Sequence, residues 1–159
     1  MNLKLSHETR TCNGKIKITG SKSETNRLLL LQALFQDFKI ENKSNSDDSL
    51  VMQAALKSTS NCIDVNHAGT AMRFLTAYFS QLEGRDVVLT GSSRMQERPI
   101  KILVDALRSI GASIKYEKKQ GYPPLRIKGK KLTGGIISLP ADISSQYISA
   151  LVMLGSVLK

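Results

Sequence analysis

Apolar residues along the chain follow two alternating patterns, one typical of strands and the other typical of buried helices. Residues 15–19 alternate charged and apolar side chains as a short strand does, whereas the apolar run that follows and ends near Phe35 is typical of a buried helix. The same patterns predict strands at 2–6, 14–19, 38–41, 62–65, 86–90, 113–118, 125–128 and 135–139, and helices at 21–35, 49–56, 71–82, 99–110 and from about 144. Strands and helices that alternate in this order predict the α/β class.

Several residues mark where these helices begin and end. Ser21 and Glu24 have the spacing of a capping box, so the first helix is expected to start at Ser21. Pro99 suits a first helical turn because its missing N–H is no loss there, and Gly111 suits the position just past a helix end. Polar residues that cap helices precede two other predicted helices; they are Ser46, Asp47, Asp48 and Asp142.

The first turn of the helix expected at 21–35 brings several anion-binding groups together. Lys22 and Ser23 lie beside free backbone N–H groups and the positive end of the helix dipole, and Arg27 shares a face with Ser23, four residues earlier. Such a cluster favours phosphate or carboxylate. The alternative is a capped helix whose charges only face solvent.

Three further polar turns lead into helices and carry similar chemistry. In the turn at 66–73, Gly69 allows a ligand to approach the backbone, Thr70 can cap the helix, and Arg73 lies about one turn in. The alternative at this turn is a plain connection between a strand and a helix.

The other two turns supply arginines and hydroxyls. An arginine such as Arg94 or Arg98 in a loop can clamp an oxyanion with two hydrogen bonds. Glu97 could hold either arginine, and the alternative is a surface ion pair worth less than about 1 kcal/mol. Ser144 and Ser145, at the start of the last helix, can present hydroxyl and N–H groups to an anion or act as caps alone.

The four turns form a weak repeat of pattern, and four anion-binding helix starts in one chain are harder to dismiss than any single one. The sequence contains no Gly-x4-Gly-Lys-Ser/Thr and no Gly-x-Gly-x-x-Gly, which excludes a P-loop or a Rossmann site as the explanation. No serine has a histidine near it in sequence, so a hydrolase triad has no support.

The charge balance indicates acidic partners. The chain of 159 residues has a formal charge of +10, which favours a nucleic acid, a membrane surface or an anionic small molecule. Part of this charge is clustered, at Lys115, Lys118, Lys119, Arg126, Lys128, Lys130 and Lys131. With Tyr116 and Tyr122 the cluster is the basis of an alternative function, a nucleic-acid-binding module, although solvated strand faces are the preferred explanation and RNP-type and helix-turn-helix signatures are absent.

Composition narrows the class of protein further. A hydrophobic content of 41% and a charged content of 23% are ordinary for a soluble globular domain, and no apolar run reaches the roughly 18–20 residues that span a membrane. The first residues have no signal-peptide core. Cys12 and Cys62 form neither a disulfide framework nor a metal spacing, so reduced cysteines and a cytoplasmic location are expected. His7 and His67 are far apart in sequence, which gives a metal site little support.

At the four polar turns the sequence resembles the 5-enolpyruvylshikimate-3-phosphate synthases (3-phosphoshikimate 1-carboxyvinyltransferases). The matching motifs occur in the family's order and at similar spacing; they are Gly20–Ser23 with Arg27, Ala68–Arg73, Arg94–Met95 with Glu97–Ile100, and Ser144–Gln146. The resemblance covers essentially the whole chain but well under half of the family's usual length. Phe74 stands where the family commonly has proline.

The resemblance implies a reaction and a set of site residues. The 5-hydroxyl of shikimate 3-phosphate would attack carbon 2 of phosphoenolpyruvate, and the tetrahedral intermediate would lose phosphate without any metal or organic cofactor. Phosphoenolpyruvate would contact Lys22, which is also the catalytic residue expected in this chain, together with Gly69 and Arg94. Shikimate 3-phosphate would be held by Ser23, Arg27, Ser144 and Ser145, with Gln146 against its ring.

The resemblance also implies a fold and a division into domains. The family fold consists of two similar domains, each an inside-out α/β barrel of βαβαββ units around buried parallel helices, with the active site between them. Residues 1–159 would be an incomplete N-terminal domain, and the proton-transfer groups would lie in a C-terminal domain that this chain lacks. The last helix is apolar through residues 151–154 and then the sequence stops, which also indicates a piece of a longer protein.

Two expectations about the chain itself follow. The full-length enzyme is expected to be a monomer, with no membrane and no nucleic acid among its partners. The 159-residue piece alone is expected to be inactive, and a third possibility is that it is only a folding unit with weak affinity for phosphate.

Overall fold

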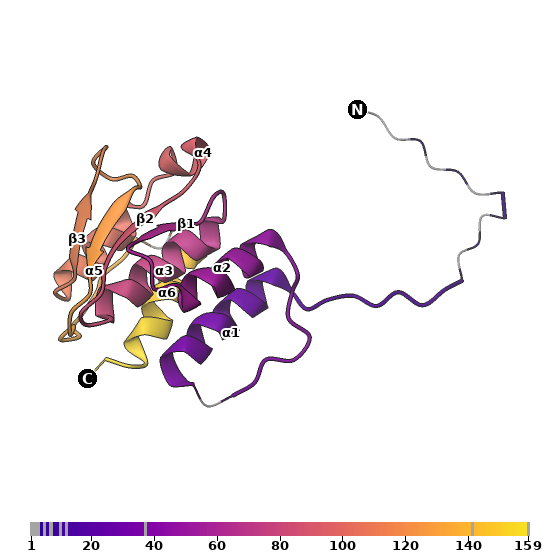
Figure 1. Ribbon diagram of the computed structural model, residues 1–159, viewed down its shortest axis with the longest axis horizontal. Coiled ribbons are helices and arrows are strands. Elements are labelled where there is room, and N and C mark those ends of the chain that lie inside the picture. Colours follow the sequence, from indigo (N-terminus) through magenta and orange to yellow (C-terminus); the bar gives the residue numbers. More distant parts are fainter. Residues whose placement is uncertain are drawn as a thin grey trace.

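A four-stranded sheet covered on one face by helices forms the packed body of the described residues (Figure 1). The computed structural model describes residues 4, 6, 8, 9, 11, 13–36, 38–140 and 142–158. The helices are α1 (Lys22–Phe35), α2 (Asp47–Lys57), α3 (Gly69–Gln81), α4 (Ser93–Gln96), α5 (Lys101–Ser109) and α6 (Ser145–Gly155). The strands are β1 (Cys62–Asp64), β2 (Asp86–Thr90), β3 (Ser113–Tyr116) and β4 (Leu125–Lys128).

The sheet has the order β1-β2-β4-β3 and is mixed. Strands β1 and β2 are parallel, with Cys62 opposite Val88, and α3 forms the crossover between them. Strand β4 pairs antiparallel with both β2 and β3. Alternate residues of β2, Val87 and Leu89, are buried against the helices, as the period of two in a half-covered strand requires.

Helix α3 is the centre of the core. Eleven of its thirteen residues are buried, which is why its sequence is apolar nearly all round rather than on one stripe. It packs against α1, α2, α5 and α6 and against strands β2 and β4. The side chains of Phe74, Leu75 and Phe79 are almost completely inaccessible to solvent.

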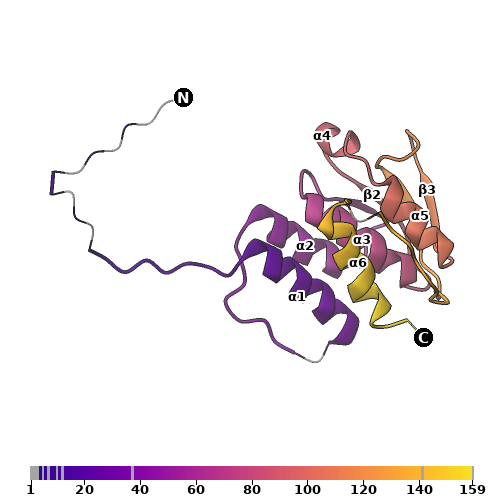
Figure 2. The same cartoon turned by 180° about the vertical axis from the view of Figure 1, so that it is seen from behind.

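Helices α1, α3 and α6 run in the same direction, so that their N-termini lie at one end of the molecule (Figures 1 and 2). The loops that follow the carboxyl ends of β1 and β2 reach the same end, because each parallel strand returns through a helix. The four polar turns of the sequence therefore lie toward this end of the molecule.

Most helix boundaries agree with the sequence patterns. Helix α1 begins after Ser21, whose hydroxyl accepts a hydrogen bond from the backbone N–H of Glu24 at 3.4 Å. Gly111 follows the C-cap residue of α5 and has a φ of +100°, the left-handed conformation that commonly ends a helix. The expected strand at 86–90 is β2, and the expected pair at 113–118 and 125–128 is β3 and β4, with β3 ending at Tyr116.

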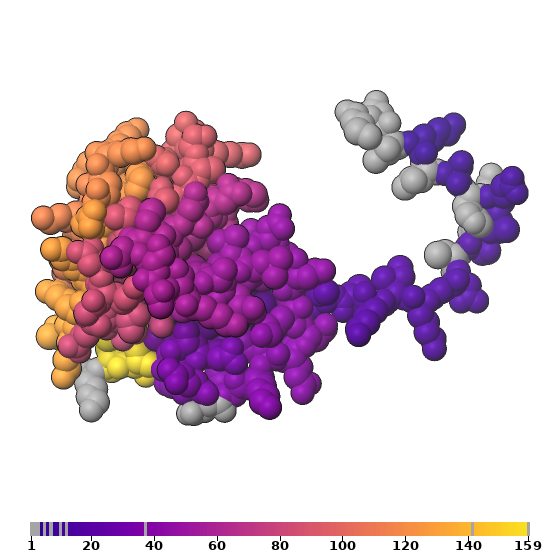
Figure 3. All heavy atoms as spheres, viewed as in Figure 1, coloured from indigo at the N-terminus to yellow at the C-terminus, as the bar shows by residue number. Residues whose placement is uncertain are grey.

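Three predicted strands were wrong. Residues 14–19, 38–41 and 135–139 form no strand, because none of them has a ladder partner within the part of the chain that the structure describes. The side chains of Ile16 and Ile18 are 86% and 74% exposed, and this segment stands clear of the packed body (Figure 3). The strand predicted at 2–6 falls mostly outside the described residues.

Several predicted caps were also wrong. Ser144, not Asp142, caps α6, since its hydroxyl accepts from the N–H of Gln146. Helix α5 starts at Lys101, so Pro99 precedes its first turn, and the segment that carries Arg94 contains the short helix α4. Helix α3 begins after Ala68, two residues earlier than expected, and Thr70 does not cap it. Ser46 precedes α2, but its hydroxyl bonds Ser44 and Ser49 rather than a helix N–H.

Candidate anion site

The loops after β1 and β2 are fastened to one another at the end where the helices begin. The N–H of Val65 donates to the carbonyl of Thr90 at 2.9 Å, and the N–H of Ser92 donates to the carbonyl of Asn66 at 3.0 Å. Gly91 allows this approach, because a Cβ there would overlap the carbonyl oxygen of Asn66. The turn before α3 and the segment that carries Arg94 are therefore held side by side.

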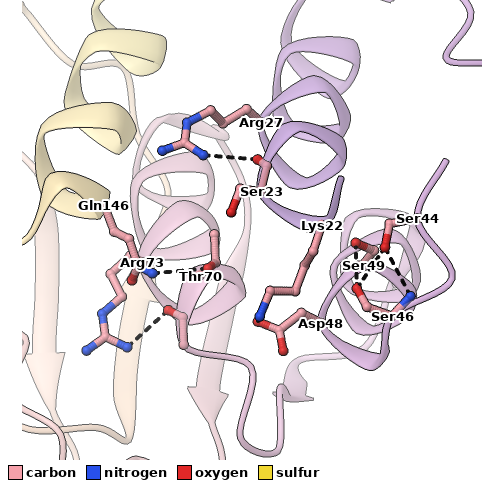
Figure 4. A network of polar contacts seen from close by, with 11 residues as sticks. Lys22, Ser23, Arg27, Ser44, Ser46, Asp48, Ser49, Thr70, Arg73 and Gln146 are labelled. Carbon is pink, nitrogen blue, oxygen red and sulfur yellow. Dashed lines mark hydrogen bonds and ion pairs between the residues drawn. The ribbon is translucent and has the colours of Figure 1, made fainter. Parts of the chain in front are cut away.

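Helix α1 presents Lys22, Ser23 and Arg27 toward this end (Figure 4). The Lys22 ammonium lies 4.0 Å from a carboxylate oxygen of Asp48 at the start of α2, and its side chain is 51% exposed. An ion pair this open contributes less than about 1 kcal/mol and leaves the ammonium available to a ligand.

Arg27 is held in place from three sides. Its Nη1 donates to the carbonyl of Ser23 at 3.0 Å, and its Nη2 donates to the hydroxyl of Ser149 on α6 at 3.1 Å. Its guanidinium also lies over the ring of Phe74, 5.8 Å from the ring centre. These contacts fix the Arg27 guanidinium against residues of α1, α3 and α6.

The starts of α3 and α6 are joined directly. The side-chain amide of Gln146 donates to the hydroxyl of Thr70 at 3.2 Å (Figure 4). Ser144 and Ser145 are exposed beside this contact, in the first turn of α6. Residues that are 76 positions apart in sequence thus form one polar surface.

Gly69 and the two loop arginines form the third part of the site. A Cβ on Gly69 would overlap the guanidinium of Arg98, so only glycine permits this close approach. Arg94 and Arg98 are exposed and line an open cleft of about 470 Å³ together with His67 and Met95. Glu97, proposed as a partner for either arginine, has no ion pair with any described residue.

Arg73 lies inside the structure rather than facing the site. It is 5% exposed, and its Nη1 and Nη2 donate to the carbonyls of Gly69 and Pro99 at 3.0 and 3.4 Å. The hydroxyl of Tyr147 donates to the same Pro99 carbonyl at 2.7 Å, beneath the Arg73 guanidinium. Burial lowers the pKa of Arg73, and the described residues supply no carboxylate for it. Arg73 therefore connects α3 to the segment that contains Arg94, Arg98 and Pro99 through buried hydrogen bonds.

Three of the side chains that the sequence singled out are held by contacts between helices. Contacts between elements link Lys22 to α2, Arg27 to α6, and Gln146 to α3. Three contributors were not anticipated: Asp48 as the partner of Lys22, Ser149 as the partner of Arg27, and the Thr70 hydroxyl as the acceptor for Gln146. No local signal reveals such pairs, because each joins residues on different helices.

The basic cluster at 115–131 is partly neutralised by its own surroundings. Arg126 donates to Glu117 at 2.8 Å and to Asp86 at 3.3 Å, and the hydrogen bond to Glu117 is the main reason that the pKa of Arg126 is raised. Lys128 lies 3.9 Å from Asp86, and the Lys119 ammonium sits 4.3 Å from the ring centre of Tyr122. Nothing in this arrangement favours the nucleic-acid-binding alternative.

Two other features concern metals and membranes. Across the described part of the chain, no group of three or more His, Cys, Asp or Glu side chains is placed to hold a metal ion. Within the same residues, no helix is both long and apolar enough to cross a bilayer.

Comparison with known proteins identifies the family. The profile described as EPSP synthase (3-phosphoshikimate 1-carboxyvinyltransferase) matches residues 56–159. A 3-phosphoshikimate 1-carboxyvinyltransferase of Bacteroides fragilis (strain YCH46) is 52% identical over 145 residues, covering 91% of this chain and 35% of that protein. One of Colwellia psychrerythraea (strain 34H) is 40% identical over 174 residues, covering 92% and 41%.

The fold agrees with this relationship. The structure of EPSP synthase from Acinetobacter baumannii superposes with a TM-score of 0.76 over 92% of this chain and 38% of that one, at 23% sequence identity. The chain belongs to the EPSP synthase family. It spans between a third and a half of the length of the curated relatives compared above.

Proposed function

We propose that this chain supplies substrate-binding groups of a 3-phosphoshikimate 1-carboxyvinyltransferase. That enzyme transfers the enolpyruvyl group of phosphoenolpyruvate to the 5-hydroxyl of shikimate 3-phosphate and releases phosphate. The observation that carries the proposal is that helices α1, α3 and α6 begin at one end of the molecule (Figure 2). Lys22 is in the first turn of α1, Arg27 is bonded to Ser149 of α6, and Arg94 and Arg98 line one cleft. Membership of the family supports the same function.

The proposed roles are those that the matching family motifs imply. Lys22, Gly69 and Arg94 bind phosphoenolpyruvate, and Lys22 takes part in catalysis. Cations and open amides are needed there because two anionic substrates repel each other at contact distance. Holding the two reactants in one orientation also removes much of the entropic part of the barrier.

The second substrate takes the groups between α1 and α6. Ser23, Arg27, Ser144 and Ser145 bind shikimate 3-phosphate, and Gln146 lies against its ring. The hydrogen bond between Arg27 and Ser149 supports this division, because it joins Arg27 to α6, the helix that begins at Ser145.

The chemical step balances without an external oxidant or reductant. The 5-hydroxyl gives up its proton as its oxygen forms a bond to carbon 2 of phosphoenolpyruvate, and carbon 3 gains a proton. The carbon–oxygen bond to phosphate then breaks, and carbon 3 loses a proton to restore the double bond. We assign the groups that move these protons to a second domain outside this chain, so the 159-residue piece binds anions but does not turn over.

We also predict a cytoplasmic location, a monomeric full-length enzyme, and a reaction without metal or organic cofactor. Each can be checked on the full-length protein by fractionation, light scattering and assay after chelation.

A chimera tests the proposed function. In the Bacteroides fragilis relative, the matching third of the protein is replaced by this chain, and phosphate release is measured with both substrates. We expect phosphate release that depends on both substrates and that disappears in the Lys22→Ala chimera. A folded chimera that releases no phosphate, beside an active parent enzyme, would contradict the assignment.

A further inference from the structure

A hollow of about 440 Å³ lies between the last turns of α1 and α2, at the opposite end of these helices from Lys22. Its volume is in the range of pockets that hold small molecules. Its lining comes from both helices, from the connection between them and from one residue of α3. The roles proposed above use none of these residues.

The spacing of residues on α1 explains why the hollow is open. Leu29 packs into the core and is 4% exposed, and the next position on that face, four residues later, is Ala33. The methyl group of Ala33 is short, and Gln36, one turn further on, is polar and exposed. The side chains of α1 therefore leave a gap toward α2 near the end of the helix.

The lining has an apolar part and a polar part. Leu29, Ala33 and Leu56 supply the apolar part. Gln32 and two further glutamines supply amide groups. The side-chain amide of Gln32 donates to the carbonyl of Phe38 at 2.6 Å, which fixes the turn after α1 beside the hollow. A ligand that fits this lining has an apolar body and a polar end.

The polar part carries positive charge. Lys43 and Lys57 line the hollow, and neither makes an ion pair with a described residue. The Lys43 ammonium lies 3.5 Å from Oε1 of Gln53, which is long for a hydrogen bond. Burial raises the pKa of Tyr78, against the effect of Arg85, so this phenol stays a neutral donor at pH 7. The described lining includes no carboxylate.

We propose that this hollow binds an amphipathic monocarboxylate, a small acid with an aromatic or branched apolar body. The apolar part of the lining holds the body, and the ammonium and amide groups hold the carboxylate. A doubly charged phosphate is disfavoured, because α1 and α2 both end beside the hollow and the negative ends of their dipoles oppose it. For a single negative charge, the two lysines offset these dipoles.

Amide NMR of the 159-residue chain tests this proposal with 3-phenylpropanoate as the probe. The acid is added up to about 20 mM, and sodium chloride keeps the ionic strength equal throughout. We expect the amide signals of residues 29–36 and 53–57 to shift with a Kd on the order of 1 mM, as a ligand of this size allows. The neutral 3-phenylpropanamide and inorganic phosphate should each bind there at least about fivefold more weakly.

Two variants, each with a matched control, locate the site. Ala33→Leu fills the hollow and should weaken binding of the acid by about tenfold or more, whereas Ala54→Leu, at an exposed position of α2 outside the lining, should not. Lys57→Gln removes one ammonium and should weaken binding by about three- to fivefold. Lys131→Gln removes an exposed cation elsewhere and should leave the affinity unchanged.

Three results would overturn the proposal. They are the absence of shifts in residues 29–36 and 53–57, equal binding of the acid and the amide, and unchanged affinity in a folded Ala33→Leu protein. If Ala33→Leu does not fold, unchanged affinity in Lys57→Gln overturns the proposal instead. The test is independent of the transferase, because the hollow lies at the other end of α1 from Lys22. An inactive chimera would therefore leave this site in place.

Discussion

Gly69, the first residue of α3, lies so close to the guanidinium of Arg98 that no side chain fits between them. The contact joins the start of α3 to the segment after β2, and Arg73 ties the same two segments together from beneath. A free helix N-terminus and an exposed cation are thus placed against each other, as a small anion requires.

The first prediction concerns Gly69→Ala. The new methyl group overlaps only the far end of a flexible side chain, so the protein should fold normally while Arg98 moves away. In the chimera we expect KM for phosphoenolpyruvate to rise by about tenfold, the size of losing one charge-assisted contact. Gly155→Ala, where a Cβ meets nothing within 4 Å, is the matched control and should leave KM unchanged. An unaltered KM in Gly69→Ala would contradict the role of this contact.

The second prediction concerns Arg94→Ala. Arg94 is exposed, so its removal should change the free energy of unfolding by less than about 0.5 kcal/mol. Turnover of the chimera should nevertheless fall by about a hundredfold or more, because a donor aimed at a reacting anion is lost. Lys131→Ala removes an exposed cation elsewhere and should keep full activity. Wild-type turnover in the Arg94→Ala chimera would show that the site is assigned to the wrong residue.

The third prediction concerns Asp48→Asn. The carboxylate of Asp48 partly neutralises Lys22 at 4.0 Å, so its loss should strengthen anion binding by about twofold. Asp47→Asn changes the same charge one residue earlier, in a side chain that makes no ion pair with a described residue, and should have a smaller effect. Isothermal titration with phosphoenolpyruvate compares the two. Weaker binding in Asp48→Asn would mean that the carboxylate positions Lys22 rather than competing for it.

The fourth prediction concerns Tyr116 and pH. Its hydroxyl is buried without a hydrogen-bond partner, and burial raises its pKa, although Arg108 opposes the shift. Because the unfolded chain loses this proton first, ionisation of Tyr116 leaves the free energy of unfolding unchanged below about pH 10 and lowers it as the pH rises toward the folded pKa. Urea unfolding should therefore show stability falling on the alkaline side.

Tyr116→Phe should remove part of that alkaline decline. At pH 7 the same change should raise the free energy of unfolding by about 1 kcal/mol, since an unsatisfied buried hydroxyl disappears while the ring keeps its contact with Arg108. Tyr122→Phe is the matched control, because its hydroxyl is not among the buried groups without a partner. A destabilised Tyr116→Phe protein at pH 7 would contradict the account.

Local signals in the sequence were sufficient to predict most of the helices and strands. The cap at Ser21, the glycine at 111 and the alternation of 86–90 each depend on a few neighbouring residues, and the structure confirms all three. Residues 14–19 have a strand's alternation as well, but a strand also needs a partner, and the described residues offer none. Periodicity alone cannot supply that information.

The sequence indicated the candidate site residues that depend on local signals, but not the contacts between distant segments. The polar turns indicated Lys22, Arg27 and Arg94 because each depends on its own helix start or loop. The sequence could not show that Arg73 turns inward, because the carbonyls that accept its hydrogen bonds lie on two segments 30 residues apart, at Gly69 and Pro99. It also gave no sign that His67 shares a cleft with the arginines.

The most direct test of the account is an NMR titration of the 159-residue chain with shikimate 3-phosphate and phosphoenolpyruvate together. Backbone amide shifts should change at the starts of α1, α3 and α6 and in the loop at 91–98, and should remain unchanged over β3 and β4. Shifts confined to residues 115–131, or no shift at millimolar concentrations of both substrates, would contradict the claim that these helix starts form one anion site.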